Sequence, residues 1–190
     1  FAASFIPNVG FIIALIPLVS LVVTVVESGL SRLDIPFFTE SMRGVSGAGG
    51  GAIHAIYGTL IQAAIAAAIS VPLGVMAAVY LVEYGGGRLA KVTTFVVDIL
   101  AGVPSIVAAL FVFALWIATL RFEQSAFAVS LALVLLMLPV VIRNTEEMLK
   151  LVPDELREAS YALGIPKWKT IVRVVMPTAL PGMISGVLLA

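Results

Sequence analysis

Residue types that could do chemistry are scarce in this sequence, which has a single histidine, His54, and no cysteine. One histidine cannot supply a pair of bases or metal ligands, and without cysteine there is no thiolate nucleophile, disulfide or thiolate metal site. The Gly-x-x-x-x-Gly-Lys loop that cradles nucleotide phosphates is also missing from the sequence. We therefore expect no catalytic site in this chain, no metal ion and no bound cofactor.

The densest group of charged side chains lies between Val152 and Pro181, in a long polar segment with apolar segments on both sides. Pro153 suits the first turn of a helix, and two carboxylates follow it, where the helix dipole favours negative charge. Gly164 can end this helix in a left-handed cap, and Pro166 can begin the next one. We predict two short helices with a corner between them. The charged residues are Asp154, Glu155, Arg157, Glu158, Lys167, Lys169 and Arg173.

The same segment contains a motif with fixed spacing: Glu158-Ala159-Ser160, then Gly164, then Val174-Val175-Met176-Pro177. It resembles the EAA loop of type I ABC importer permeases, which reads Glu-Ala-Ala, three residues, Gly, nine residues, then Ile-x-Leu-Pro, and the spacing is kept throughout. The departures are Ser160 for the second alanine, Val174 for isoleucine and Met176 for leucine.

In that family the first short helix is the coupling helix, which docks into a groove on the ATPase subunit. The resemblance therefore assigns ATPase coupling to Glu158, Ala159, Ser160, Gly164 and Pro177. Glu158 would contact or orient the interface, and Gly164 would form a corner free of side chains. The alternative is an ordinary amphipathic loop, in which Glu158 lies on a solvated helix face.

Composition indicates a membrane protein. The 190 residues are 61% hydrophobic and only 12% charged, with a mean hydropathy of +1.15. Soluble domains have about 25% charged residues, so lipid is the expected solvent. The net charge of zero argues against a nucleic-acid partner, which would need a basic surface.

We predict an all-α, polytopic helical membrane protein with about five spans, since crossing a bilayer takes roughly 20 apolar residues. A kink or break is expected at Pro72 and a break at Gly102-Val103-Pro104. Many small residues in the second span predict close packing inside a bundle, and the apolar run up to Ala190 predicts a truncated last span. The spans are Phe5–Val26, Ile53–Tyr84, Lys91–Leu120, Ala126–Ile142 and a fifth starting after Pro177 and Pro181.

The basic residues are distributed unevenly between the two predicted sides of the membrane, eight against three. The positive-inside rule places the richer side, and with it the segment Val152–Pro181, in the cytoplasm. The richer side holds Arg88, Lys91, Arg143, Lys150, Arg157, Lys167, Lys169 and Arg173, and the other holds Arg32, Arg43 and Arg121.

Further stretches are similar to the PstA-type permeases of bacterial phosphate importers. The similarity covers roughly 51–190 and includes Thr178 to Gly182. It implies a first helix and external linker at 1–51, and an ABC transporter permease (MetI-like) domain at 52–190 with a coupling loop at 152–181. The stretches are Gly58-Thr59-Leu60 with Val71-Pro72-Leu73-Gly74 and Val82-Glu83-Tyr84, then Ala101 to Val107, then Leu138 to Leu149.

This resemblance implies a multi-pass subunit of the bacterial inner membrane. Its partners would be a homologous second permease, a cytoplasmic ATPase dimer that hydrolyses ATP, and an external phosphate-binding protein. Two alternatives stay open. One is a type I permease for another oxyanion or small solute. The other is an ATP-independent channel or secondary transporter, which would normally carry intramembrane charged relays, and only Asp98 fits that description.

An anion crossing a low-dielectric region needs positive charge or free backbone N–H groups. Arg143 follows an apolar run and can pair with Glu146 or Glu147 at helical spacing; alternatively it marks the end of the span and snorkels. Pro104 and Ser105 could restart a broken helix with free N–H groups facing inward, or simply form a kink. The remaining polar residues are assigned by position: Asp98 to a gate or a pair with Lys91 or Arg88, and His54 to the external mouth.

Overall fold

The computed structural model describes residues 2–31, 33–42 and 49–190, and these are almost entirely helical. No β-strand forms among them, apart from one isolated bridge between Ser41 and Ala52. The predicted all-α class is confirmed. The chain divides into two compact units, Phe1–Tyr57 and Gly58–Ala190, which are described separately.

The first unit contains α1 (Ala2–Leu30), α2 (Ile35–Thr39) and the start of α3 (Ile53–Val79). The side chains described in α1 are nearly all exposed, and the helix is apolar on every side, which suits a helix surrounded by lipid. Asp34 caps α2 by accepting a hydrogen bond from the Phe37 N–H at 3.0 Å. Arg32 and Arg43, two of the basic residues counted above, lie outside the described residues.

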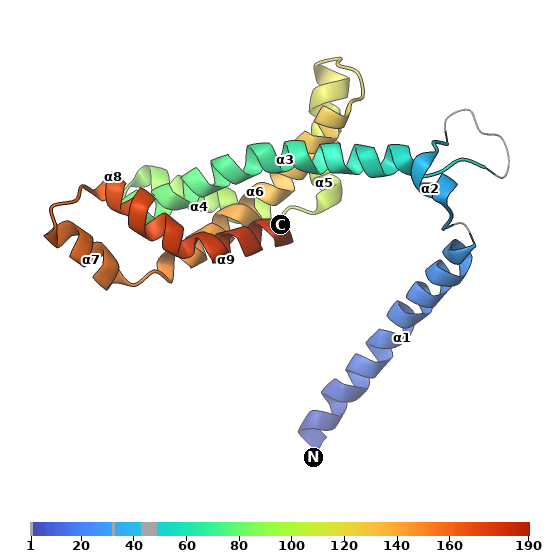
Figure 1. Ribbon diagram of the computed structural model, residues 1–190, viewed down its shortest axis with the longest axis horizontal. Helices are drawn as coiled ribbons and strands as arrows, with labels where there is room; N and C mark the ends of the chain where they lie inside the picture. The colour runs from blue at the N-terminus through green and yellow to red at the C-terminus, as the bar shows by residue number, and fades with distance from the viewer. Residues whose placement is uncertain (1, 32, 43–48) are drawn as a thin grey trace. The chain divides into compact units, whose positions relative to one another are not determined.

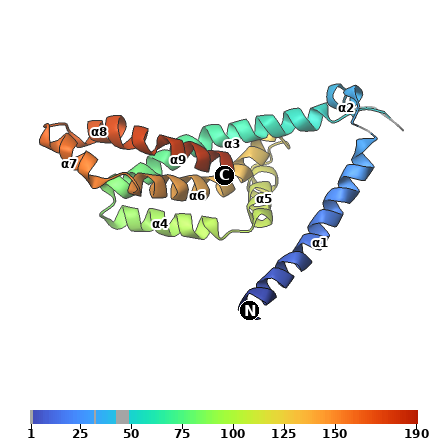
Figure 2. The same ribbon diagram turned by 60° about the horizontal axis from the view of Figure 1, so that its bottom comes forward.

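The second unit is a bundle in which α6 lies between α4 and α9 (Figures 1 and 2). At one end of the unit α7 and α8 project beyond the other helices. The helices after α3 are η1 (Tyr80–Tyr84), α4 (Arg88–Ala101), α5 (Ser105–Phe113), η2 (Ala114–Thr119), α6 (Ala126–Lys150), α7 (Asp154–Ala162), α8 (Lys167–Thr170), η3 (Ile171–Val175) and α9 (Met176–Leu189). The three η segments are wound as π-helix.

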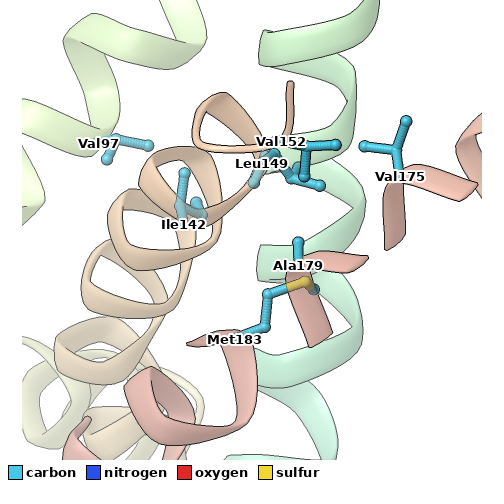
Figure 3. Close-up of a cluster of buried hydrophobic side chains, with 8 residues drawn as sticks. Val97, Ile142, Leu149, Val152, Val175, Ala179 and Met183 are labelled. Atoms are coloured by element: carbon cyan, nitrogen blue, oxygen red, sulfur yellow. The ribbon is translucent and has the colours of Figure 1, made fainter. Parts of the chain in front are cut away.

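The core of this unit lies at the end of the bundle from which α7 and α8 emerge. Figure 3 shows how α4, α6 and α9 contribute side chains to it, and α3 adds Ala78. The buried residues of the cluster are Ala78, Val97, Ile142, Leu149, Val152, Val175, Ala179 and Met183. Val152 and Val175 flank the α7–α8 segment in the sequence, so both of its ends are packed into the bundle.

Small residues make the close packing of α3 possible, as the sequence predicted. The buried residues of α3 are Ala66, Ser70, Gly74 and Ala78, which recur at every fourth position and form one stripe. A Cβ on Gly74 would lie 2.6 Å from Cγ1 of Val141 on α6, closer than carbon atoms approach. Such a stripe lets two helix backbones approach closely when lipid offers no hydrophobic driving force.

Within the part of the chain that the structure describes, four helices are long and apolar enough to cross a membrane, or five if one bent pair counts as a single span. The bent pair is Arg88–Ala101 with Ser105–Thr119, at 103°, so the break predicted at Gly102-Val103-Pro104 is confirmed.

At Pro72 a kink or a break was expected, and α3 continues through this residue without a break. The expected start of the last span was wrong: the span does not begin after Pro177 and Pro181, because the helical run extends from Lys167 to Leu189. The π-helical turn η3 lies directly before α9 and its Pro177. Such local adjustments re-satisfy the backbone groups that a proline frees inside a membrane helix.

Candidate functional site

The corner between α7 and α8 has the local structure that the sequence predicts. Pro153 precedes α7, and Asp154 and Glu155 occupy its first turn. Gly164 has φ +74°, the left-handed conformation that favours glycine. Its N–H donates to the Tyr161 carbonyl at 2.9 Å. Because nothing lies within 4 Å of the position of a Cβ on Gly164, the backbone conformation and not the space around it requires glycine.

A hydroxyl pair fixes the angle between the two helices. Ser160 of α7 and Thr170 of α8 are both buried, and their hydroxyl oxygens are 2.8 Å apart. An alanine at position 160, as in the family motif, could not make this hydrogen bond. Ser160 therefore faces the inside of the corner and not the surface where a partner would dock.

The surface of the corner is formed by the other motif residues. Glu158, Ala159 and Gly164 are exposed, and Leu163 between them is a largely exposed apolar side chain. Pro177 is also exposed but lies in α9, beyond the corner.

Arg157 attaches α7 to the rest of the bundle, a role that the sequence did not reveal. Its guanidinium donates to Oε1 of Glu83 from Nε at 3.2 Å and from Nη2 at 3.1 Å. It also donates to the carbonyls of Val152 at 2.7 Å and Leu149 at 2.9 Å, and to Oδ1 of Asp154 at 3.0 Å. These bonds use all five N–H groups of the side chain. Glu83 lies 74 residues before Arg157, so no local pattern could predict the pair.

The other helix of the corner, α8, also bonds to Glu83. Lys167, the first residue of α8, donates from Nζ to the backbone carbonyl of Glu83. Its Nζ also lies 4.8 Å from the ring centroid of Tyr84, within the range of a cation–π interaction. The segment η1, which continues α3, is thus bonded to both α7 and α8.

A second cluster of charges surrounds Arg143 in α6. Its guanidinium is paired with Asp98 of α4 and, at 2.8 Å, with Glu146 of its own helix. The predicted pairing with Glu146 is confirmed, but the suggested pairing of Asp98 with Lys91 or Arg88 is wrong. The packing of α4 on α6 brings Asp98 to a cation that is 45 residues away in the sequence.

A recess of about 360 Å³ lies next to Arg143, and Val103, Pro139, Asn144 and Glu147 also line it. Pro104 and Ser105 are exposed at the start of α5 and do not line the recess. The structure therefore places Arg143 and Glu147 together, with Glu146 buried behind them as a partner of Arg143, and leaves Pro104 and Ser105 outside. Arg143 shares this region with three carboxylates, those of Asp98, Glu146 and Glu147.

Comparison with known proteins identifies a protein family. The sequence pattern of the family described as "Binding-protein-dependent transport system inner membrane component" matches residues 70–190.

Several relatives with curated descriptions are phosphate transport system permease proteins. PstA 1 of Mycobacterium tuberculosis (strain CDC 1551 / Oshkosh) is 67% identical over 184 residues, which cover 95% of this chain and 60% of the relative. PstA of Mycobacterium leprae (strain TN) is 68% identical over 186 residues, with coverages of 95% and 60%. PstA of Yersinia pestis is 44% identical over 174 residues, with coverages of 91% and 59%. The chain thus spans less than two thirds of the length of these relatives.

Two solved structures share the fold, both inward-facing conformations of the MetNI methionine ABC transporter. One has a TM-score of 0.60 at 22% identity, and the match covers 73% of this chain and 65% of the chain in that structure. The other has a TM-score of 0.59 at 21% identity, with coverages of 83% and 70%. At this identity the likeness concerns the fold alone, and it agrees with the helical permease bundle described above.

Proposed function

This chain belongs to the family of binding-protein-dependent transport system inner membrane components, and from that premise we propose that it is a transmembrane permease subunit of an ATP-driven phosphate importer. The observation that carries the proposal is the 67% identity over 184 residues to a phosphate transport permease. The motif at Glu158–Pro177 and the corner it forms in the second unit support the ABC importer class.

In this proposal the corner of α7 and α8 docks onto a cytoplasmic ATPase. Glu158 and Ala159 are exposed on the projecting helix, and Leu163 offers an apolar contact beside them. Closure of the ATPase dimer on binding ATP would move α7, and the bundle attached to it would open the pathway outward. Gly164 shapes the corner through its left-handed backbone, Ser160 does so through its buried bond to Thr170, and Pro177 lies further along on α9.

The proposed assembly contains this chain, a homologous second permease, the ATPase dimer and an external phosphate-binding protein. The chain would lie in the bacterial inner membrane with the corner in the cytoplasm. ATP would be hydrolysed by the partner, while this chain would have no catalytic site and bind no cofactor. The excess of basic residues on the side of the corner supports that orientation.

For the phosphate route we propose Arg143 as the cation that phosphate meets. Glu146 would hold its guanidinium from the buried side, and Glu147 would line the entrance. Phosphate would have to compete with Asp98, which occupies the exposed side of Arg143. The N–H groups of Ser105 and Ile106, at the start of α5, have no acceptor within their own helix and would offer a second contact, whereas the N–H of Val107 already donates to the Pro104 carbonyl at 2.9 Å.

Uptake of labelled phosphate tests the proposal, in cells that lack their own importer and carry the full-length parent gene with its neighbouring ATPase and binding-protein genes. We expect uptake, and we expect Gly164→Trp and Glu158→Trp to abolish both uptake and ATPase co-purification. Glu123→Trp, at an exposed carboxylate outside the corner, is the matched control and should retain both.

Three outcomes would change the assignment. Uptake of another oxyanion but not of phosphate would keep the permease and discard its substrate. ATPase co-purification and transport that survive Gly164→Trp would contradict the docking site. The absence of any ATP-dependent uptake would favour a channel or secondary transporter.

A further inference from the structure

The π-helical segment η1, which continues α3, carries a carboxylate in an unfavourable place. Glu83 lies in the last turn of η1, where the helix dipole disfavours negative charge, and its side chain is almost fully buried. The chain turns tightly after it, because a Cβ on Gly85 would overlap the Leu81 carbonyl oxygen. A buried carboxylate in this position needs a cation and hydrogen bonds to remain charged.

Arg157 supplies both, and it does so from the projecting helix α7. One guanidinium reaches the side chain of Glu83 in η1, the carbonyl of Leu149 in the last turn of α6, the carbonyl of Val152 in the connection to α7, and Asp154 in the first turn of α7. Three elements, η1, the end of α6 and α7, therefore meet at a single side chain. A lysine could not replace it, because an ammonium has three donors without the planar geometry of a guanidinium.

The connections on either side of α7 would otherwise let it move alone. Leu151 to Pro153 precede it outside regular helix, and Leu163 to Pro166 follow it through the left-handed Gly164. A force on α7 could rotate it about these two connections without displacing the bundle. The bonds of Arg157 oppose that rotation, because breaking them would leave Glu83 buried and unpaired.

We propose that Arg157 is a positioning residue that makes α7, η1 (which continues α3) and the end of α6 move as one unit, so that a displacement of α7 reaches the bundle. This inference rests on the proposed function, since it assumes that a partner moves α7. A purely structural role for Arg157 would affect folding but not the number of phosphate ions carried per ATP.

The first experiment measures labelled phosphate carried per ATP hydrolysed by the complete importer in proteoliposomes. Glu83→Gln removes the charge but keeps a similar shape, and it should lower this ratio about fivefold or more, as expected when a coupling free energy is lost. ATPase co-purification should be unchanged. Asp154→Asn is the matched control: it breaks another ion pair of the same arginine, but one within α7, and should leave the ratio unchanged.

Two results would overturn the proposal: a wild-type ratio in Glu83→Gln, or an equal fall in Asp154→Asn. If Glu83→Gln does not accumulate in the membrane, Arg157→Lys replaces it, and the same comparison with Asp154→Asn applies.

A second experiment needs no phosphate and therefore separates this inference from the proposed function. Because the chain has no cysteine, spin labels can be attached to cysteines introduced at the exposed positions Ala162 on α7 and Leu73 on α3. In the complex with cysteine-free partners, the distance between the labels should stay constant on ATP binding in the wild type and change in Glu83→Gln. A change already present in the wild type would rule out movement as one unit. A complex that keeps this distance constant but carries no phosphate would contradict the proposed substrate alone.

Discussion

The α7–α8 corner and the recess beside α6 are each organised around an arginine that bonds to one buried glutamate and one exposed aspartate. In the corner, Arg157 bonds to Glu83, whose side chain is 5% exposed and lies on another helix, and to Asp154, which is 87% exposed and lies in α7 itself. At the recess the arrangement is reversed. Arg143 bonds to Glu146, 7% exposed and on its own helix, and to Asp98, 59% exposed and on another helix.

This reversal gives the two regions different mechanical properties. Breaking a buried ion pair by removing one partner costs about 3–5 kcal/mol, whereas an exposed pair contributes about 0–1 kcal/mol. The bond between helices is therefore strong at Arg157 and weak at Arg143. Arg157 also donates to two backbone carbonyls, and its side chain is 13% exposed against 36% for Arg143. We therefore expect the Arg157–Glu83 pair to keep the corner attached to the bundle. We expect the Arg143–Asp98 pair between α4 and α6 to open more easily, so that Arg143 can bind another anion.

The largest effect is expected for Arg157→Ala, which leaves Glu83 buried without a cation. The free energy of unfolding, measured by denaturant titration in detergent micelles, should fall by about 3–5 kcal/mol. The double variant Arg157→Ala with Glu83→Leu should recover part of the loss, because no unpaired charge is left buried. If Arg157→Ala lowered the free energy of unfolding by less than about 1 kcal/mol, as an exposed ion pair would, Arg157 would not link the helices more strongly than Arg143 does.

The second effect concerns the backbone of the corner. Gly164→Val forces a branched residue to φ +74° and should cost about 1–2 kcal/mol in the free energy of unfolding. Gly164→Asn is the control and should cost less, because asparagine tolerates the left-handed conformation. Equal losses for the two variants would mean that side-chain size, and not φ, limits this position.

A smaller loss is expected for Ser160→Ala. It removes the buried hydrogen bond to Thr170, which keeps a weak bond to the Pro166 carbonyl at 3.4 Å, so unfolding should become easier by about 1 kcal/mol. Ser130→Ala is the matched control, since Ser130 is equally buried but bonds only to a carbonyl of its own helix, at 2.8 Å. A similar loss in both variants would show that the hydroxyl pair does not hold the corner.

The smallest effect is expected for Asp98→Asn at the recess. Because the pair with Arg143 is exposed, the free energy of unfolding should fall by less than about 1 kcal/mol. Glu146→Gln, which perturbs the buried partner of the same arginine, should cost more. If Asp98→Asn proved the more harmful of the two, the link between α4 and α6 would be a fixed attachment like that of the corner.

Much of the fold followed from local patterns. Long apolar runs predicted the spans, Gly102-Val103-Pro104 predicted the break between α4 and α5, and Gly164 predicted the left-handed end of α7. The start of the last span could not be read from its prolines, because a π-helical turn precedes Pro177 and the helix continues through it. A proline inside a helix removes one hydrogen bond, but a local change of winding can re-satisfy the freed backbone groups, so the residue type alone does not say whether the helix breaks.

The sequence by itself determined the membrane class, the helical segments and the motif of the corner, because composition, hydrophobic runs and motif spacing are properties of adjacent residues. The tertiary structure alone decided that Ser160 faces Thr170, that Asp98 meets Arg143 and that Glu83 meets Arg157. The last two pairs join residues 45 and 74 positions apart. Whether such charges meet depends on how the helices pack, and the same packing excludes water and so decides which of the two bonds is strong.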